Sequence, residues 1–340
     1  MRNDPIHRYA GIFFALLVGA AASSGALGQE KERKDLVLKG DAQCTRCHDA
    51  GDDYPVLSIG RTKHGVVADS RTPTCTSCHG ASETHMNKPA DAKERPKPTR
   101  TFGGNLARPS ASDAAMVDRY FGVAGRQSTT PVEERNQACL NCHQGGKRIH
   151  WTSGAHANRD VACTSCHQIH TQHDKVRDKV TQSDVCFACH KEQRSQIHRP
   201  SRHPIIEGKV ACSDCHNPHG TAGEKMLVRD NVNDTCYTCH MEKRGPFVRT
   251  HQPVQENCAI CHNPHGSTTD NLLKTRAGLL CQQCHEPTQH RGALPGFNAG
   301  NSNASRNVGL TAGRACLNCH TNIHGTNNPA NVSNERTFRR

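Results

Sequence analysis

The stretch Ala211-Cys-Ser-Asp-Cys-His-Asn-Pro-His-Gly220 contains two cysteines separated by two residues, with a histidine directly after the second cysteine. This Cys-x-x-Cys-His pattern occurs ten times and uses all 20 cysteines of the chain. The cysteine pairs are Cys44 and Cys47, Cys75 and Cys78, Cys139 and Cys142, Cys163 and Cys166, Cys186 and Cys189, Cys212 and Cys215, Cys236 and Cys239, Cys258 and Cys261, Cys281 and Cys284, and Cys316 and Cys319. The histidines that follow them are His48, His79, His143, His167, His190, His216, His240, His262, His285 and His320.

The repeated pattern is the attachment signature of c-type haem. Two thiols can bond to the two vinyl groups of a haem, and the adjacent imidazole can bind its iron. Zinc sites built from paired cysteines give no reason for a histidine after every second cysteine. A disulfide framework would show varied spacings rather than one spacing ten times. We therefore expect ten covalently bound haems and no structural disulfide.

A second set of ten histidines follows the motifs and could supply a second axial ligand to every iron. In alternating order, these histidines lie far from or close to the preceding motif. The far set is His64, His156, His203, His251 and His290, and the close set is His85, His170, His219, His265 and His324. A histidine three residues after a motif histidine cannot reach the far face of its own haem, so His170, His219 and His265 must serve neighbouring haems.

The spacing does not say which haem each of these histidines serves, and a role on the surface or beside a haem propionate stays open for each. His150, His173 and His198 exceed the ligands that ten irons need. Methionine is scarce, so Met/His ligation can occur at a minority of sites at most. All-histidine ligation predicts low reduction potentials.

The composition argues against an ordinary hydrophobic core. Aromatic residues make up 4% of the chain, hydrophobic residues 34% with the cysteines included, and the mean hydropathy is −0.74. So little apolar surface does not offset the conformational entropy lost on folding. Porphyrins would supply the missing apolar surface. We expect a multihaem c-type cytochrome, mostly loops with short α-helices wrapped around a chain of ten haems, with little or no β-structure.

A formal net charge of +12 raises the question of nucleic-acid binding. Each ferric bis-histidine haem carries a charge of about −1 once its two propionates are counted, and a cofactor's own charge must be included. Ten haems cancel most of the excess, so the lysines and arginines are expected to pair with propionates and solvent. No nucleic-acid partner is expected.

The N-terminus is typical of a secretory signal peptide over residues 1–28. Arg2 and Arg8 supply positive charge, residues 11–22 are apolar, and residues 26–28 form a small-x-small cleavage site. A membrane anchor is the alternative, but the run is shorter than the ~20 residues that span a bilayer. We then expect a two-haem section at 29–85, an inserted linker at 86–136, an eight-haem section at 137–325, and a flexible tail at 326–340.

In its motifs the chain resembles the periplasmic decahaem cytochromes of the MtrA/DmsE/MtoA family. The resemblance covers the mature chain and is most specific in residues 211–220, 233–240, 280–285 and 313–325. It implies a wire of ten bis-histidine haems in the periplasm, associated with the outer membrane. It also implies three kinds of partner: an outer-membrane β-barrel protein around the wire, an extracellular multihaem cytochrome, and periplasmic or inner-membrane electron carriers.

Two other functions stay open beside an electron conduit. A soluble periplasmic electron carrier or store would have the same motifs. A multihaem reductase would need an open iron position, often marked by lysine in place of the motif histidine. All ten motifs end in histidine, so we expect no enzyme activity. The sequence does not distinguish metal reduction from Fe(II) oxidation.

Overall fold

The computed structural model describes residues 42–52, 55–66, 71–103, 130–285, 316–318 and 320–327. The predicted signal peptide lies outside these ranges, as do His290, Cys319 and most of the predicted insertion and tail. No helix in the described ranges is both long and apolar enough to cross a membrane.

Short helices and loops make up the described structure. The α-helices are α1 (Ala42–Thr45), α2 (Cys75–His79), α3 (Glu83–Met86), α5 (Val132–Leu140), α6 (Lys179–Phe187), α7 (Lys191–Gln196), α8 (Cys212–Cys215), α9 (Val232–Tyr237), α10 (Gln252–Glu256) and α11 (Ala277–Cys281). Between them lie 3₁₀ turns, of which Val56–Arg61 is one. Within these ranges β-structure is limited to isolated bridges such as Ser201 with Ser267. The predicted fold class, short helices and loops without strands, is confirmed for the described residues.

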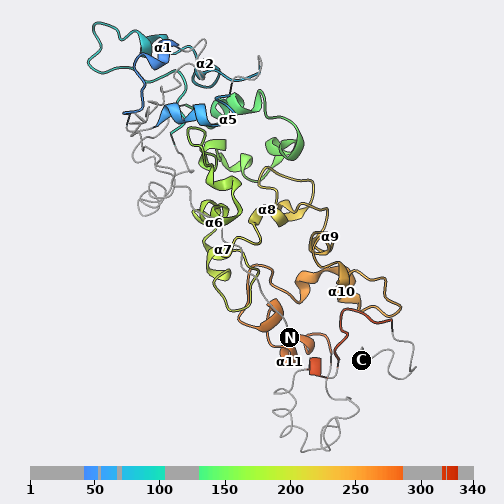
Figure 1. The fold of residues 1–340 in the computed structure, drawn as a ribbon. Helices are drawn as coiled ribbons and strands as arrows, with labels where there is room; N and C mark the ends of the chain where they lie inside the picture. Colours follow the sequence, from blue (N-terminus) through green and yellow to red (C-terminus); the bar gives the residue numbers. More distant parts are fainter. Residues whose placement is uncertain are drawn as a thin grey trace, which may run out of the picture.

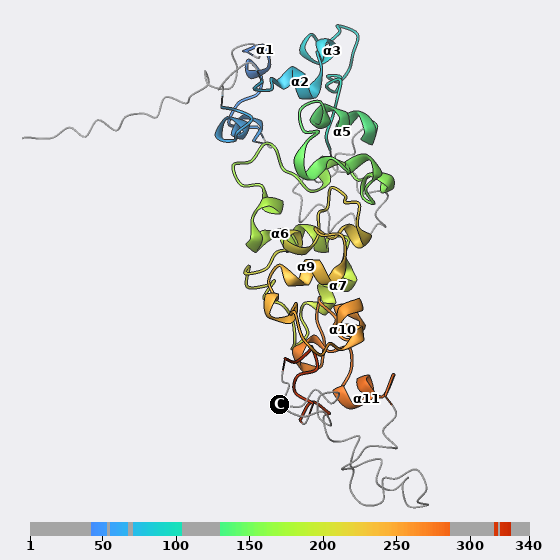
Figure 2. The same cartoon turned by 90° about the vertical axis from the view of Figure 1, so that its right-hand side faces the viewer.

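The molecule is elongated, and its elements follow one another along the long axis (Figures 1 and 2). Helices α1, α2 and α3 lie at one end, α5 and α6 follow, and α10 and α11 lie toward the other end (Figure 2). Chain order therefore sets the order of the motifs along the rod.

The alternation seen in the sequence reappears in the helices. α5, α6, α9 and α11 each place the first cysteine of a motif in their last turn: Cys139, Cys186, Cys236 and Cys281. The motifs between them form their own short turn instead, as in α8 and the 3₁₀ turn Cys258–Ile260. Each unit therefore consists of a helix that ends in a motif, followed by a loop that carries the next motif.

Buried amide side chains join the two motifs of a unit. Asn136 of α5 donates from Nδ2 to the Val161 carbonyl at 3.2 Å, and its Oδ1 accepts from the Cys163 backbone N–H at 2.8 Å. Asn233 of α9 holds Cys258 in the same way, at 2.7 Å. Both asparagines lie three residues before a first cysteine and fix the position of the next first cysteine.

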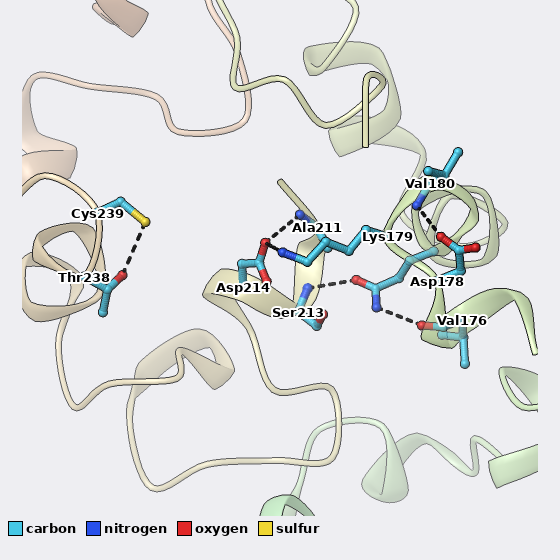
Figure 3. A network of polar contacts seen from close by, with 10 residues as sticks. Val176, Asp178, Lys179, Val180, Ala211, Ser213, Asp214, Thr238 and Cys239 are labelled. Carbon is cyan, nitrogen blue, oxygen red and sulfur yellow. Dashed lines mark hydrogen bonds and ion pairs between the residues drawn. The ribbon is translucent and has the colours of Figure 1, made fainter. Parts of the chain in front are cut away.

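In the middle unit Gln182 of α6, four residues before Cys186, makes a similar link. Its Oε1 accepts from the Ser213 N–H at 2.9 Å and its Nε2 donates to the Val176 carbonyl at 2.8 Å. Figure 3 shows the surrounding contacts, in which Lys179 of α6 reaches Asp214 of α8 at 2.9 Å. Helices α6 and α8 are thus tied together at both a buried amide and an exposed ion pair.

Glycines after three of the close-set histidines allow loops from earlier units to pack against the backbone. Gly220, Gly266 and Gly325 have φ of +101°, +150° and +141°. A Cβ on Gly220 would lie 2.5 Å from the His150 carbonyl oxygen, and one on Gly266 would overlap the Gln196 carbonyl oxygen. These glycines therefore permit both a left-handed backbone and close approach of a second chain segment.

Gly266→Ala is expected to destabilise the protein by at least about 2 kcal/mol, since it adds backbone strain to a clash with Gln196. Gly145→Ala is the matched control, because a Cβ at that residue has no atom within 4 Å. The measurement is the thermal midpoint of the two holoproteins at one scan rate. Equal midpoints would show that the loop over Gly266 is not packed as described.

The described part of the chain buries few apolar side chains. They are Trp151, Ala162, Val185, Ile197, Ile205, Ala211 and Leu227. Among polar residues, Arg135 is only 1% exposed. This small number of buried apolar side chains agrees with the composition. Most of the packing contacts are then expected to come from a bound group.

The predicted section boundaries are crossed by contacts. Helix α5 spans the boundary at residue 136/137, because Asn136 in it positions Cys163 in the following section. The His170 ring donates to the Val56 carbonyl at 2.9 Å across 114 positions of sequence. Thr326, the first residue of the predicted tail, exchanges two backbone hydrogen bonds with Arg249. The two-haem and eight-haem sections remain a proposal, but the described contacts connect them.

Candidate haem-binding sites

Each described motif folds as one helical turn. The backbone N–H of the motif histidine donates to the carbonyl of the first cysteine, four residues earlier, at 2.9 Å in His167 and His216 and at 3.1 Å in His48. One turn of helix is about 3.6 residues, so positions i and i+4 lie on the same face. The first cysteine and the histidine of a motif can therefore face one porphyrin together.

Nine histidine rings from the motifs each lie opposite a second histidine ring. The pairs are His48 with His85, His79 with His170, His143 with His64, His167 with His219, His190 with His156, His216 with His265, His240 with His203, His262 with His324, and His285 with His251. All partners belong to the set that the sequence predicts as distal ligands.

The ring separation is constant although the ring orientation is not. Centroid distances run from 5.9 Å in the His64–His143 pair to 6.3 Å in the His203–His240 pair. The interplanar angle ranges from 6° in His167–His219 to 85° in His156–His190. Two metal–nitrogen bonds of about 2 Å and two ring radii of about 1 Å place imidazole centroids about 6 Å apart on either side of a metal. The geometry fits an iron between each pair of rings better than direct ring stacking.

The pairs follow a rule that the spacing alone left open. Each close-set histidine except His85 pairs with the histidine two motifs earlier. His219, for example, follows the sixth motif and lies opposite His167 of the fourth. Histidines of the far set serve a later motif, so His156, after the third, lies opposite His190 of the fifth. His48 is the exception, since its partner His85 follows the second motif. Apart from His48 with His85, every pair thus joins two successive units.

These nine pairs include every histidine of the predicted ligand set except His290 and His320. His290 lies outside the described residues, as does Cys319 beside His320. The three histidines in excess, His150, His173 and His198, are all exposed and join none of the ring pairs above. This separation of ligand candidates from excess histidines is the one that the repeat predicts.

The first cysteines of the two motifs in a unit interact. Hydrogen bonding to Cys163, followed by burial, raises the pKa of Cys139. At the second cysteine of the fourth motif, burial, followed by the charge of Cys189, raises the pKa of Cys166 to about 11. The first-cysteine contacts are Cys139 with Cys163, Cys186 with Cys212, Cys236 with Cys258, and Cys281 with Cys316.

Comparison with known proteins gives a relative that matches most of the chain. Over 301 residues the chain is 40% identical to multiheme cytochrome MtrA of Shewanella baltica, covering 86% of this chain and 80% of the relative. This chain belongs to the MtrA family of multihaem cytochromes. Haem c is its cofactor, bound at the Cys-x-x-Cys-His motifs, and electron transfer is its chemistry.

Shorter matches place this MtrA-family chain among c-type cytochromes more widely. It is 29% identical over 157 residues to cytochrome c-type protein NrfB of Haemophilus influenzae, covering 43% of this chain and 58% of that protein. NrfB of Escherichia coli O6:H1 is 27% identical over 178 residues, covering 49% of this chain and 74% of that protein. The family model for a doubled CXXCH motif matches residues 203–245 and 251–290, and the model for NrfB-like cytochrome c-type proteins matches residues 108–181.

Buried arginines of the MtrA-family chain have polar atoms that the protein leaves unpaired. The Nε and Nη2 of Arg135 are buried without a hydrogen-bond partner, although Nη1 donates to the Gly103 carbonyl at 3.0 Å. The Nε atoms of Arg148 and Arg202 are likewise buried and unpaired. A buried guanidinium without a partner is costly, and a carboxylate is its usual partner. Haem propionates would satisfy these atoms, so the side chains present fit the cofactor.

Burial keeps the distal imidazoles in the form that binds a metal. Burial, with a smaller contribution from His79, lowers the pKa of His170 to about 4. Burial, followed by the charges of His167 and Arg148, lowers the pKa of His219 to about 4. Because only the neutral imidazole has a free nitrogen lone pair, both rings are ready to bind iron above about pH 4.

In seven of the paired rings a backbone carbonyl holds the outer nitrogen, Nδ1. The Nδ1–H of His156 donates to Pro218 at 2.8 Å, and that of His203 donates to Pro264 at 2.8 Å. Such second contacts fix the tautomer and the orientation of a metal-binding ring. These two hydrogen bonds could not be predicted from the sequence. Their acceptors are backbone carbonyls about 60 residues away, and any type of residue can supply a backbone carbonyl.

Two consecutive left-handed residues position the acceptor for His216. Lys225 and Met226 have φ of +51° and +54°, and the Lys225 carbonyl accepts from His216 Nδ1 at 2.9 Å. Asn271 and Leu272 repeat this turn for His262, at 2.8 Å. Non-glycine residues in this conformation cost about 1–3 kcal/mol each and persist where the surrounding structure requires them. Here the turn directs a carbonyl at a motif histidine.

Proposed function

We propose that this MtrA-family cytochrome is an electron conduit that carries electrons along ten bis-histidine haems from one end of the rod to the other. The supporting observation is the set of nine histidine ring pairs, which, apart from His48 with His85, join successive units along the rod. A haem held by each of these pairs would lie between neighbouring units. The order of the pairs follows the order of the motifs, so the haems would form one line along the described chain.

The chain's own residues hold each iron rather than offer it to a substrate. A ring on each side, such as His167 and His219, would fill both axial positions of an iron bound between them. The haem iron supplies reversible one-electron chemistry between its ferric and ferrous states. Because the described sites have a histidine on either side, we propose that the protein carries electrons and is not an enzyme. This distinguishes it from a multihaem reductase, which needs an open iron position.

The location and partners proposed for the conduit rest on the family resemblance. We propose that the protein lies in the periplasm at the outer membrane, inside a separate β-barrel protein. At one end it would exchange electrons with periplasmic or inner-membrane carriers, and at the other with an extracellular multihaem cytochrome. Both metal reduction and Fe(II) oxidation are compatible with such a path. The competing proposal is a periplasmic carrier that acts without a barrel.

Liposomes that enclose a redox dye test the conduit. Vesicles with this cytochrome in complex with its barrel are expected to pass electrons from an external reductant to the dye. Vesicles with the barrel alone, or with the cytochrome alone, are expected to leave the dye oxidised. Equal dye reduction by the cytochrome alone, or none with the complex, would contradict the conduit and favour the periplasmic carrier.

A further inference from the structure

One motif histidine differs from its counterparts in what its outer nitrogen contacts. His216 and His262 donate from Nδ1 to backbone carbonyls nine residues later. His167 occupies the same place in its unit, but its Nδ1 lies 2.7 Å from the Oδ2 carboxylate oxygen of Asp174. The fourth haem site therefore has an anionic partner where the sixth and eighth sites have a neutral one.

The sequence explains the difference. The sixth and eighth motifs continue as His-Asn-Pro-His-Gly and reach the left-handed turns at Lys225 and Asn271. The fourth motif continues as His-Gln-Ile-His-Thr, residues 167–171, and lacks the glycine and the turn. Asp174 takes the place of the turn carbonyl. Its second oxygen, Oδ1, accepts from the Gln168 backbone N–H at 3.2 Å, which fixes the carboxylate against the ring.

The first site has a carboxylate at the same nitrogen. His48 Nδ1 lies 2.8 Å from Asp52 Oδ2, one helical turn later in the chain. The side chain of Asp52 is 32% exposed, whereas that of Asp174 is 14% exposed. The ion pairs of the described residues give Asp174 no lysine or arginine partner. Its charge is therefore less screened than that of Asp52 and acts mainly on His167.

A carboxylate that accepts from the outer nitrogen makes an imidazole a stronger donor to its metal. A stronger donor favours the ferric ion over the ferrous ion, because the ferric ion has the higher charge. The negative carboxylate adds to this preference through its own field. Both effects lower the reduction potential of the iron that the histidine binds.

We propose that Asp174 and Asp52 are positioning residues that hold the fourth and the first haem at lower reduction potentials than they would have with a neutral acceptor. Electrons therefore occupy these two haems for less of the time, and the reduction potential varies from haem to haem along the conduit. The inference rests on haem ligation by the ring pairs of the proposed conduit, and it assigns the tuning of two sites to two named carboxylates. It does not depend on the barrel partner.

Asp174→Asn tests the proposal on the purified holoprotein by spectroelectrochemical titration. The change keeps an oxygen acceptor for His167 and removes the charge. The oxidised-to-reduced ratio of one haem is expected to fall roughly tenfold at a fixed potential, which equals about 59 mV upward for a one-electron couple. The difference from the parent titration should integrate to one haem. Asp52→Asn should shift one haem in the same direction by a smaller amount.

Asp178→Asn is the matched control. Asp178 also lies beside a histidine, 3.5 Å from His173, but that histidine belongs to no ring pair. Asn at 178 can still cap the helix through the bond to Val180. Its titration should coincide with that of the parent protein. A merely structural role for Asp174 would change haem content or spin state without a directed shift in potential.

The outcomes separate this proposal from the conduit. If Asp174→Asn retains all haems low-spin and its titration coincides with the parent's, the tuning role of Asp174 is wrong while haem ligation stands. If Asp174→Asn loses haem, the redox titration of Asp52→Asn, at the more exposed site, becomes the test. If that titration coincides with the parent's, the proposal is overturned. The liposome experiment tests the conduit by itself.

Discussion

His219→Ala is expected to convert one haem in the protein from six-coordinate low-spin to five-coordinate high-spin. The His219 ring lies 6.0 Å from the His167 ring and parallel to it, so its loss opens one axial position at the fourth haem. The ferric spectrum should gain one haem equivalent of high-spin signal. The reduced variant should bind one equivalent of carbon monoxide, whereas the parent protein should bind none.

Matched controls and a second change locate the affected haem. His150→Ala, His173→Ala and His198→Ala each remove an exposed histidine outside the ring pairs and should leave the spectrum unchanged. Adding Asp174→Asn to His219→Ala should shift the potential of the high-spin haem, because Asp174 contacts His167. A shift confined to a low-spin haem would place His219 on a different iron. A high-spin signal from any of the three controls would show that the replaced histidine binds an iron, contrary to the pairing described for that unit.

The chain without haem is expected to be largely unfolded, which is the largest effect on stability that we predict. Seven apolar side chains are buried in the described part, and several buried arginine nitrogens there have no partner in the protein. Without porphyrins nothing replaces these contacts, so folding depends on the cofactor as it does in small metal-binding domains. Far-ultraviolet circular dichroism and hydrogen exchange on the mature chain made without haem attachment should show little helix and little protection.

A graded control separates loss of one haem from general damage. Replacing Cys258 and Cys261 together with alanine removes one attachment site and should reduce helix content partially, with the other units still folded. A haem-free chain that retained cooperative unfolding and native helix content would contradict the view that the cofactors form the core.

The sequence was sufficient to predict the cofactor and the fold class, because covalent attachment demands a fixed local pattern. It also singled out the histidines that the structure brings together in pairs. Ten identical spacings specify where each haem is bonded, and low hydropathy specifies that helices stay short. His170 and His219 could also be assigned to other haems by reach alone. The structure places them opposite His79 and His167.

Pairing across units and the contacts behind the rings could not be predicted, because they depend on how distant loops pack. His203 faces His240 only because the loop after the fifth motif lies beside the seventh. The Pro264 carbonyl behind His203 has no side-chain signature at all. Asn136 and Asn233 did carry a signal, an asparagine three residues before a first cysteine, that becomes meaningful once Cys163 and Cys258 are seen to bond to them.

The positions of the irons in an experimental map of the holoprotein test the central claim most directly. The account predicts ten irons in one line along the rod, in the order of the motifs. Each of nine should lie midway between a named ring pair, such as His167 with His219 and His190 with His156. Any of these nine irons found between histidines other than its named pair, an iron with a free axial position, or a break in the line would contradict this expectation.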